Sequence, residues 1–313
     1  MRLTRSRAIG LLAAAASLRA LPARAQSVTV HIGYAATDIG GYPLYGKSLG
    51  IFARNGIDVE LTAFNNSQAI SNAAAAGALD VGASDMLQMA NGFIHGVPFG
   101  YFAGAALYSS AEPTLVLCVA KDSAYRKATD LEGQTIAVIA LNSVSSISVQ
   151  EWLHVNGADL AKVKIFEAPF PTMLPGLERG TIAAALLAEP FVTLGASQTR
   201  QLAKTYDTIG KEFYVNAWFA NRDWIKRSPD VVRRFRTAIY ETAQWANTHH
   251  AESAVMLADI TKLPLENIRT MKRASFATSL DTKLMQPVLD VGVRYKAIEK
   301  QVAAADLIAV IPG

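Results

Sequence analysis

The strongest constraint on the fold is the alternation of strand-like and helix-like segments along the chain. Val28, Val30, Ile32 and Tyr34 alternate with polar or small residues, which predicts a first strand over 28–35. Further strands are expected at 58–64, 80–84, 99–104, 114–121, 135–140, 163–168, 182–188, 203–208 and 214–221. Helical patterns separate or follow them, including 43–55, 231–246 and 281–296. This alternation predicts an α/β fold built in layers.

The N-terminus has the arrangement of a secretory signal peptide. Arg2, Arg5 and Arg7 precede the apolar run Ala8–Leu18, and small residues lead to Ala25. The apolar run is much shorter than the roughly 20 residues that span a membrane. We therefore expect cleavage near Ala25 and a periplasmic protein without direct membrane insertion, with the Sec and twin-arginine routes both left open.

The basic net charge of the whole chain comes from this leader. Subtracting its five arginines from 30 basic residues leaves 25 against 26 acidic residues, a net charge of −1. A nearly neutral mature chain gives no support for a nucleic-acid partner. The single cysteine, Cys118, lies in an apolar run, so we expect a buried core residue and no internal disulfide.

Several short motifs occur in a fixed order along the chain. They are Ile32-Gly33-Tyr34, the segment Gly50–Leu61, Ala76-Gly77-Ala78-Leu79-Asp80-Val81-Gly82, Asp130-Leu131-Glu132-Gly133 and Ala188-Glu189-Pro190-Phe191. In order and spacing they resemble the solute-binding proteins of bacterial ABC importers, in the branch that binds nitrate, sulfonates, taurine or thiamine-related pyrimidine precursors. The chain departs from the family pattern at Ala183, often an aspartate, and at Asn142-Ser143, where the family has Gly-Ser.

The resemblance implies a type II periplasmic-binding-protein fold with two lobes. Each lobe would hold a mixed sheet flanked by helices, and two crossover strands would form the hinge. Lobe one would comprise 27–119 and 218–313, and lobe two 120–217, with crossings near Ala120 and Ala217. The implied partners are a small-molecule ligand, an ABC permease and its ATPase. The protein would be a monomer with no cofactor, no metal and no catalytic residue.

Ligands of open α/β sheets bind beyond the carboxyl ends of the strands, so the loops at those ends are the candidate site. These loops contain four acids, Asp38, Asp85, Glu112 and Glu189, together with several aromatic residues and no lysine or arginine. From them we select as ligand-binding candidates Asp38, Tyr42, Asn66, Ser67, Asp85, Tyr108, Ser143, Ser145, Glu189, Asn216 and Trp218.

The chemistry of these loops favours a nitrogen heterocycle or an amine over an anion. Unpaired carboxylates would repel a buried sulfonate or nitrate, whereas they accept N–H bonds, and aromatic faces stack on rings. Helix N-termini could still hold an anion without any basic side chain. Asp85 and Ser143 could equally serve only as helix caps.

Two other classes of protein share this architecture. Thiamine-pyrimidine synthases, the enzyme alternative, need a cysteine cluster and a reactive histidine. This chain has one cysteine and five histidines without metal or triad spacing. The effector domains of transcription regulators would need an N-terminal helix-turn-helix, and a leader occupies that position here.

Overall fold

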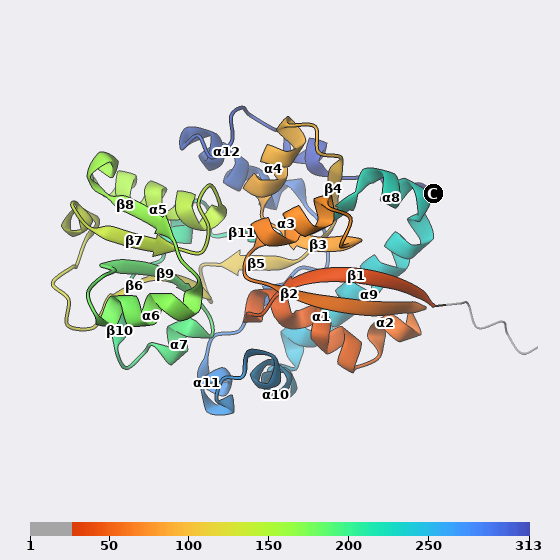
Figure 1. Ribbon diagram of the computed structural model, residues 1–313, viewed down its shortest axis with the longest axis horizontal. Helices are drawn as coiled ribbons and strands as arrows, with labels where there is room; N and C mark the ends of the chain where they lie inside the picture. Colours follow the sequence, from red (N-terminus) through yellow and green to blue (C-terminus); the bar gives the residue numbers. More distant parts are fainter. Residues whose placement is uncertain (1–26) are drawn as a thin grey trace, which may run out of the picture.

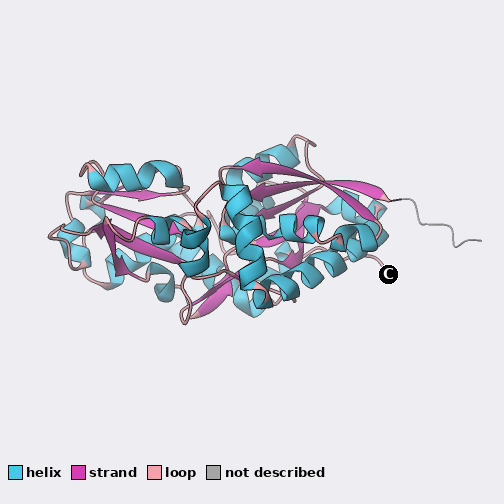
Figure 2. Ribbon diagram, turned by 90° about the horizontal axis from the view of Figure 1, so that it is seen from below, coloured by secondary structure: helices cyan, strands magenta, loops and turns pink. Residues whose placement is uncertain are grey.

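The computed structural model describes residues 27–313, and the expected signal peptide at 1–25 lies outside them. Two five-stranded sheets and one three-stranded sheet form the framework. Figure 2 shows the two large sheets side by side, each between helices. The expected α/β class with two helix-flanked sheets is therefore confirmed. Within the described part, no helix is long and apolar enough to cross a membrane.

Sheet one has the strand order β2-β1-β3-β12-β4. Its strands are β1 (Val28–Ala35), β2 (Ile57–Phe64), β3 (Val81–Ser84), β4 (Phe99–Gly104) and β12 (Ala217–Asn221). β1 is parallel to β2 and β3, whereas β12 is antiparallel to β3 and β4. The helices around it are α1 (Asp38–Ser48), α2 (Ile51–Arg54), α3 (Ser67–Ala75), α4 (Met86–Ile94), α8 (Arg222–Arg227) and α9 (Pro229–Thr248) (Figure 1). We call this unit lobe one.

Sheet two has the order β10-β6-β9-β7-β8. Its strands are β6 (Leu115–Ala120), β7 (Thr135–Val138), β8 (Lys164–Glu167), β9 (Ala184–Ala188) and β10 (Thr199–Ala203). In Figure 1, α5 (Val144–Val155) lies above this sheet, and α6 (Phe170–Glu178) and α7 (Phe191–Leu194) lie below it. All five residues of β9 are buried, as expected for a strand covered on both faces. We call this unit lobe two.

A small third sheet lies where the chain passes between the lobes. It has the order β11-β5-β13, with β5 (Ala106–Ser109), β11 (Glu212–Tyr214) and β13 (Ser275–Phe276). The chain leaves lobe one through β5 and returns through β11. β6 follows β5 and pairs in sheet two, so 115–119, which the sequence analysis assigned to lobe one, lies in lobe two's sheet. An apolar run is equally suited to either sheet, and only pairing decides between them.

The C-terminal helices join the lobes. α10 (His250–Thr261) packs on α1 and α9, while α11 (Leu265–Thr270) contacts α7 of lobe two. α12 (Gln286–Arg294) lies between α4 of lobe one and α5 of lobe two (Figure 1). Short 3-10 helices occupy Ala128–Leu131, Leu160–Lys162, Thr205–Thr208, Thr282–Leu284 and Ala304–Leu307.

Several expected boundaries were wrong. The helix expected to begin at Pro43 begins at Asp38, because the Thr37 side chain caps it by accepting from the Gly40 N–H at 3.3 Å. The strand expected over 203–208 ends at Ala203 and is followed by a 3-10 turn, in which the Thr208 hydroxyl donates to the Thr205 carbonyl. The strand expected over 214–221 is two strands, β11 and β12.

Glycine at the end of β4 permits a close approach that any side chain would block. A Cβ at Gly104 would lie 2.2 Å from the Ser279 carbonyl oxygen, which is backbone and cannot rotate away. We expect Gly104→Ala to destabilise the protein by roughly 1–3 kcal/mol in urea unfolding. The matched control is Gly92→Ala inside α4, where the nearest atom would be at 3.5 Å. That change should be neutral or stabilising by up to about 1 kcal/mol, and equal effects of both changes would contradict the packing argument.

Candidate functional site

A cavity of about 100 Å³ lies between the two lobes. Lobe one contributes residues from the loop after β1, the loop after β2 and the start of α4. Lobe two contributes residues from β6, the β7–α5 loop, α6, β9 and the 3-10 turn at Tyr206, and the returning crossover adds Val215 and Asn216. An engineered cavity of about 150 Å³ holds benzene, so this space suits a ligand of about one small ring.

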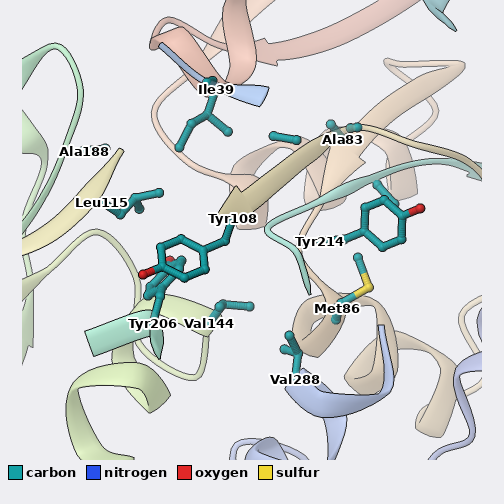
Figure 3. Packing of buried hydrophobic residues seen from close by; sticks show 14 of the residues in the cluster. Ile39, Ala83, Met86, Tyr108, Leu115, Val144, Ala188, Tyr206, Tyr214 and Val288 are labelled. Atoms are coloured by element: carbon teal, nitrogen blue, oxygen red, sulfur yellow. The ribbon is translucent and has the colours of Figure 1, made fainter. Parts of the chain in front are cut away.

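The wall of the cavity combines apolar side chains with hydroxyl and amide groups. Apolar lining residues labelled in Figure 3 include Ile39 from lobe one and Leu115, Val144 and Tyr206 from lobe two. The polar lining comprises Thr37, Asn65, Asn66, Ser67, Gln68, Asp85, Gln88, Ser143, Ser145, Tyr206 and Asn216. Among residues 27–313, Asp85 is the one charged side chain in this lining, and no lysine or arginine of that range is part of it.

Asp85 is held in place by the turn that starts α4. Its Oδ1 accepts the backbone N–H groups of Leu87 at 2.9 Å and Gln88 at 3.0 Å, which makes it the N-cap. The Tyr101 hydroxyl donates to the Ser84 and Asp85 carbonyls and so helps to hold this turn in place. Both capping bonds go to Oδ1, so the cap does not use Oδ2.

Burial changes the acidity of this carboxyl group. Desolvation raises the pKa of Asp85 to about 6, against the opposing effect of backbone N–H groups of Gln88, Leu87 and Val144. Val144 is the first residue of α5, so the carboxyl of lobe one faces a helix N-terminus of lobe two. The N-terminus of α5, which is the positive end of the helix dipole, thus already faces the Asp85 carboxyl group.

The serines at the start of α5 mostly bond to their own loop. The Ser143 hydroxyl donates to the Ala140 carbonyl at 2.6 Å, and its backbone N–H donates to the Ser146 hydroxyl at 3.1 Å. The Ser143 and Ser145 hydroxyls also lie 2.7 Å apart. These bonds fit the capping interpretation of this loop, while both side chains remain part of the cavity wall.

Six of the eleven predicted site residues line this cavity. They are Asn66, Ser67, Asp85, Ser143, Ser145 and Asn216. Asn66 caps α3 by accepting from the Ala69 N–H at 2.9 Å. The Asn216 side-chain oxygen accepts from the Ala106 N–H at 2.9 Å, and this bond does not use its NH2 group. The rule that ligands bind beyond the carboxyl ends of strands thus selected residues from both lobes and from the crossover.

The other five residues do not lie on the cavity wall. Asp38 is fully buried in an ion pair with Arg273, and its second oxygen accepts from the Ala274 N–H. The Glu189 carboxyl accepts from the Thr193 backbone N–H and hydroxyl, both at 3.0 Å. The remaining three, Tyr42, Trp218 and Tyr108, are aromatic.

The three aromatic candidates belong to the core. Tyr42 and Trp218 are 1% exposed, and the Trp218 indole N–H donates to the Tyr42 hydroxyl. Tyr108 donates its hydroxyl to Asp207 at 2.7 Å and packs against Tyr206. Each of these polar atoms has a partner within the protein, which a sequence alone does not reveal.

Several lining residues were not predicted from the sequence. Gln68 and Gln88 lie in the first turns of α3 and α4, so the rule that selected Ser67 and Asp85 would have found them. Tyr206 had no comparable signal, because its segment was expected to be a strand. No group of three or more metal-ligating side chains converges anywhere in residues 27–313.

Several solved structures of binding proteins share this fold. The aliphatic sulphonate binding protein SsuA from Escherichia coli is 15% identical, with 91% of this chain and 92% of that chain covered and a TM-score of 0.72. The alkanesulfonate-binding protein SsuA from Xanthomonas axonopodis pv. citri, bound to MOPS, is 17% identical, with coverages of 91% and 99% and a TM-score of 0.74. The nitrate-binding protein NrtA from Synechocystis PCC 6803 is 15% identical, with coverages of 89% and 84% and a TM-score of 0.75.

These structural similarities confirm the expected periplasmic-binding-protein fold. At such low sequence identities they show the fold alone. No curated protein sequence matches the chain. A family model described as NMT1/THI5 like matches residues 38–253, which is more than half of the chain. The resemblance inferred from the short motifs is thereby confirmed, and the chain belongs to the NMT1/THI5-like family.

Proposed function

We propose that this protein is the substrate-binding component of an ABC importer, which captures a small solute between its lobes and delivers it to a membrane permease. The observation that carries the proposal is the cavity of about 100 Å³ walled by both lobes. A solute that contacts both walls stabilises the arrangement in which the lobes meet, and this is how hinged domains close on ligands. The signal-peptide pattern at 1–25 supports action in the periplasm.

The ligand is a neutral or cationic nitrogen heterocycle or a small amine. Within the described part of the chain, Asp85 is the only charged group on the wall, and its Oδ2 is not used by the helix cap. An N–H donor can satisfy that oxygen, whereas a sulfonate or nitrate would be buried beside a carboxylate without a basic partner. The positive end of α5 does not offset this cost, because it faces Asp85 itself.

A binding role fits the wall better than the alternative of an enzyme resembling thiamine-pyrimidine synthase. From the residues that the structure describes, the wall receives no histidine and no cysteine that could act as a base or a nucleophile. Cys118 is buried in β6, where desolvation raises the pKa of its thiol and disfavours the reactive thiolate.

A thermal-shift screen of residues 26–313 tests this proposal. The panel sets aminopyrimidines, other nitrogen heterocycles and small amines against taurine, alkanesulfonates and nitrate at pH 8. A ligand at a hundred times its Kd stabilises the folded state by about 2.7 kcal/mol, which gives a clear shift. We expect the first group to contain the stabilising solute. Stabilisation by a sulfonate or nitrate alone at pH 8 would contradict the proposed ligand class.

The pH dependence of that shift is a second test with a definite sign. Binding of an N–H donor needs the ionised Asp85 carboxylate, so it should weaken as the pH falls from 8 to 5 through the pKa of about 6. Binding of an anion should strengthen over the same range, because protonation removes the like charge. Melting temperatures measured at both pH values, with and without the solute, distinguish the two.

A further inference from the structure

A buried carboxylate connects the two lobes at a point outside the ligand cavity. Glu151 lies on α5 of lobe two, and its side chain is only 6% exposed. Its Oε2 accepts the Tyr295 hydroxyl at 2.5 Å, and its Oε1 accepts the Arg294 guanidinium. None of these three residues lines the cavity between the lobes.

Both partners of Glu151 are fixed to lobe one. Arg294 is the last residue of α12, and Tyr295 is its C-cap. Val288 and Leu289 of α12 are fully buried. α12 also touches α4 so closely that a Cβ at Gly292 would lie 2.4 Å from Leu87 Cδ2. Arg294 and Tyr295 therefore move with lobe one, whereas their acceptor moves with lobe two.

The chemistry of this contact makes it strong and reversible. A hydrogen bond to a charged group is stronger than a neutral one, and Glu151 accepts two, one of them from a cation. The Arg294 guanidinium is always charged, and Glu151 raises its pKa further. The Arg294 side chain is 55% exposed, and separation of the lobes would let water reach the carboxylate. Opening therefore leaves no buried charge without a partner.

We propose that Glu151, Arg294 and Tyr295 form an interlobe latch that shifts the lobes toward the closed arrangement before any solute binds. This inference rests on the proposed function, because it assigns the latch a role in the affinity of the same cavity. The affinity for a solute that needs the closed form scales with the fraction of closed protein. The latch thus sets affinity for every solute by one common factor, independently of the chemistry of the cavity wall.

The distance between the lobes in the solute-free protein tests the latch directly. Nitroxide labels at Ala75→Cys on α3 and Lys164→Cys on β8 place one exposed position on each lobe, while the native Cys118 is buried. Double electron–electron resonance then measures the distance distribution. In Glu151→Gln we expect the ratio of open to closed protein to rise about tenfold, because the charged acceptor is lost.

Two further latch variants and a matched control complete the experiment. Arg294→Gln removes the charge from the exposed side and should shift the distribution in the same direction, even if Glu151→Gln folds poorly. Tyr295→Phe should give a smaller shift. The control is Glu132→Gln, which breaks an ion pair with Lys162 that lies entirely within lobe two at 3.0 Å, and it should leave the distribution unchanged.

Three outcomes would overturn the latch. They are wild-type distances in all folded latch variants, an equal shift in Glu132→Gln, and a solute-free wild-type protein that is already open. The measurement contains no solute, so it can fail while the proposed function stands. The thermal-shift screen can likewise fail while the latch stands, and the two failures are distinguishable.

Discussion

The substitution Asp85→Asn is expected to weaken binding of a nitrogen heterocycle or an amine by about 100-fold at pH 8, because the charged acceptor for the ligand is lost. Asparagine is as good an N-cap as aspartate, so the start of α4 should be preserved. The measurement is isothermal titration of wild type and Asp85→Asn with the stabilising solute. The matched control is Asp281→Asn, which changes another capping aspartate that lies away from the cavity wall.

The stability of Asp85→Asn has a predicted sign as well. Burial raises the pKa of Asp85 from an ordinary value of 3.8 to about 6. A carboxyl with a raised pKa contributes stability that is present below about pH 4 and is lost as the pH rises through about 6. At pH 8 the ionised group therefore opposes folding, and the uncharged variant should be at least as stable as wild type in urea. A variant with wild-type affinity, or one that loses several kcal/mol, would show that Asp85 is only a structural cap.

Removing the buried cation at position 273 should destabilise the protein by roughly 3–5 kcal/mol. The Arg273 guanidinium donates to Asp38 Oδ1 from Nε at 3.1 Å and from Nη2 at 2.9 Å. Their side chains are 7% and 0% exposed, so Arg273→Leu leaves a carboxylate in the interior without its partner. This pair also ties the start of α1 to the segment before β13. Urea unfolding of wild type and Arg273→Leu measures the loss.

The control for this prediction is an arginine with an exposed partner. Arg269 and Glu266 form an ion pair at 2.9 Å with side chains 51% and 77% exposed, and Arg269→Leu should change stability by less than about 0.5 kcal/mol. If Arg273→Leu is equally mild, the buried pair does not hold α1 in place. A selective loss of solute affinity in Arg273→Leu would return Asp38 to the list of ligand contacts.

Much of the fold could be predicted because it is encoded locally. Alternating residues in 28–35 identified β1, and the apolar run around Cys118 identified β6. The sheet to which β6 belongs is decided by pairing with β9, which lies about seventy residues away, and no local pattern carries that information. The capping hydroxyl of Thr37 was similarly overlooked in favour of Pro43, so α1 was expected to start late.

A polar residue that follows a strand lies on the wall of the candidate site only where no distant side chain binds it. Asp85 and Ser67 meet that condition and lie on the cavity wall. Asp38 follows a strand equally closely, but Arg273, 235 positions further on, binds its carboxylate. The Glu189 carboxyl accepts a hydrogen bond from the Thr193 hydroxyl in the next turn. Such competition for hydrogen bonds from other groups of the protein, near or distant in the sequence, is the reason that strand ends give candidates rather than a site.

The most direct test of the account is hydrogen–deuterium exchange with and without the solute that gives the largest thermal shift. We predict simultaneous protection of 35–40 and 65–68 in lobe one and of 139–145 in lobe two, because the cavity wall is built from all three segments. Protection confined to one lobe, or protection only outside these segments, would contradict capture of the solute between the lobes.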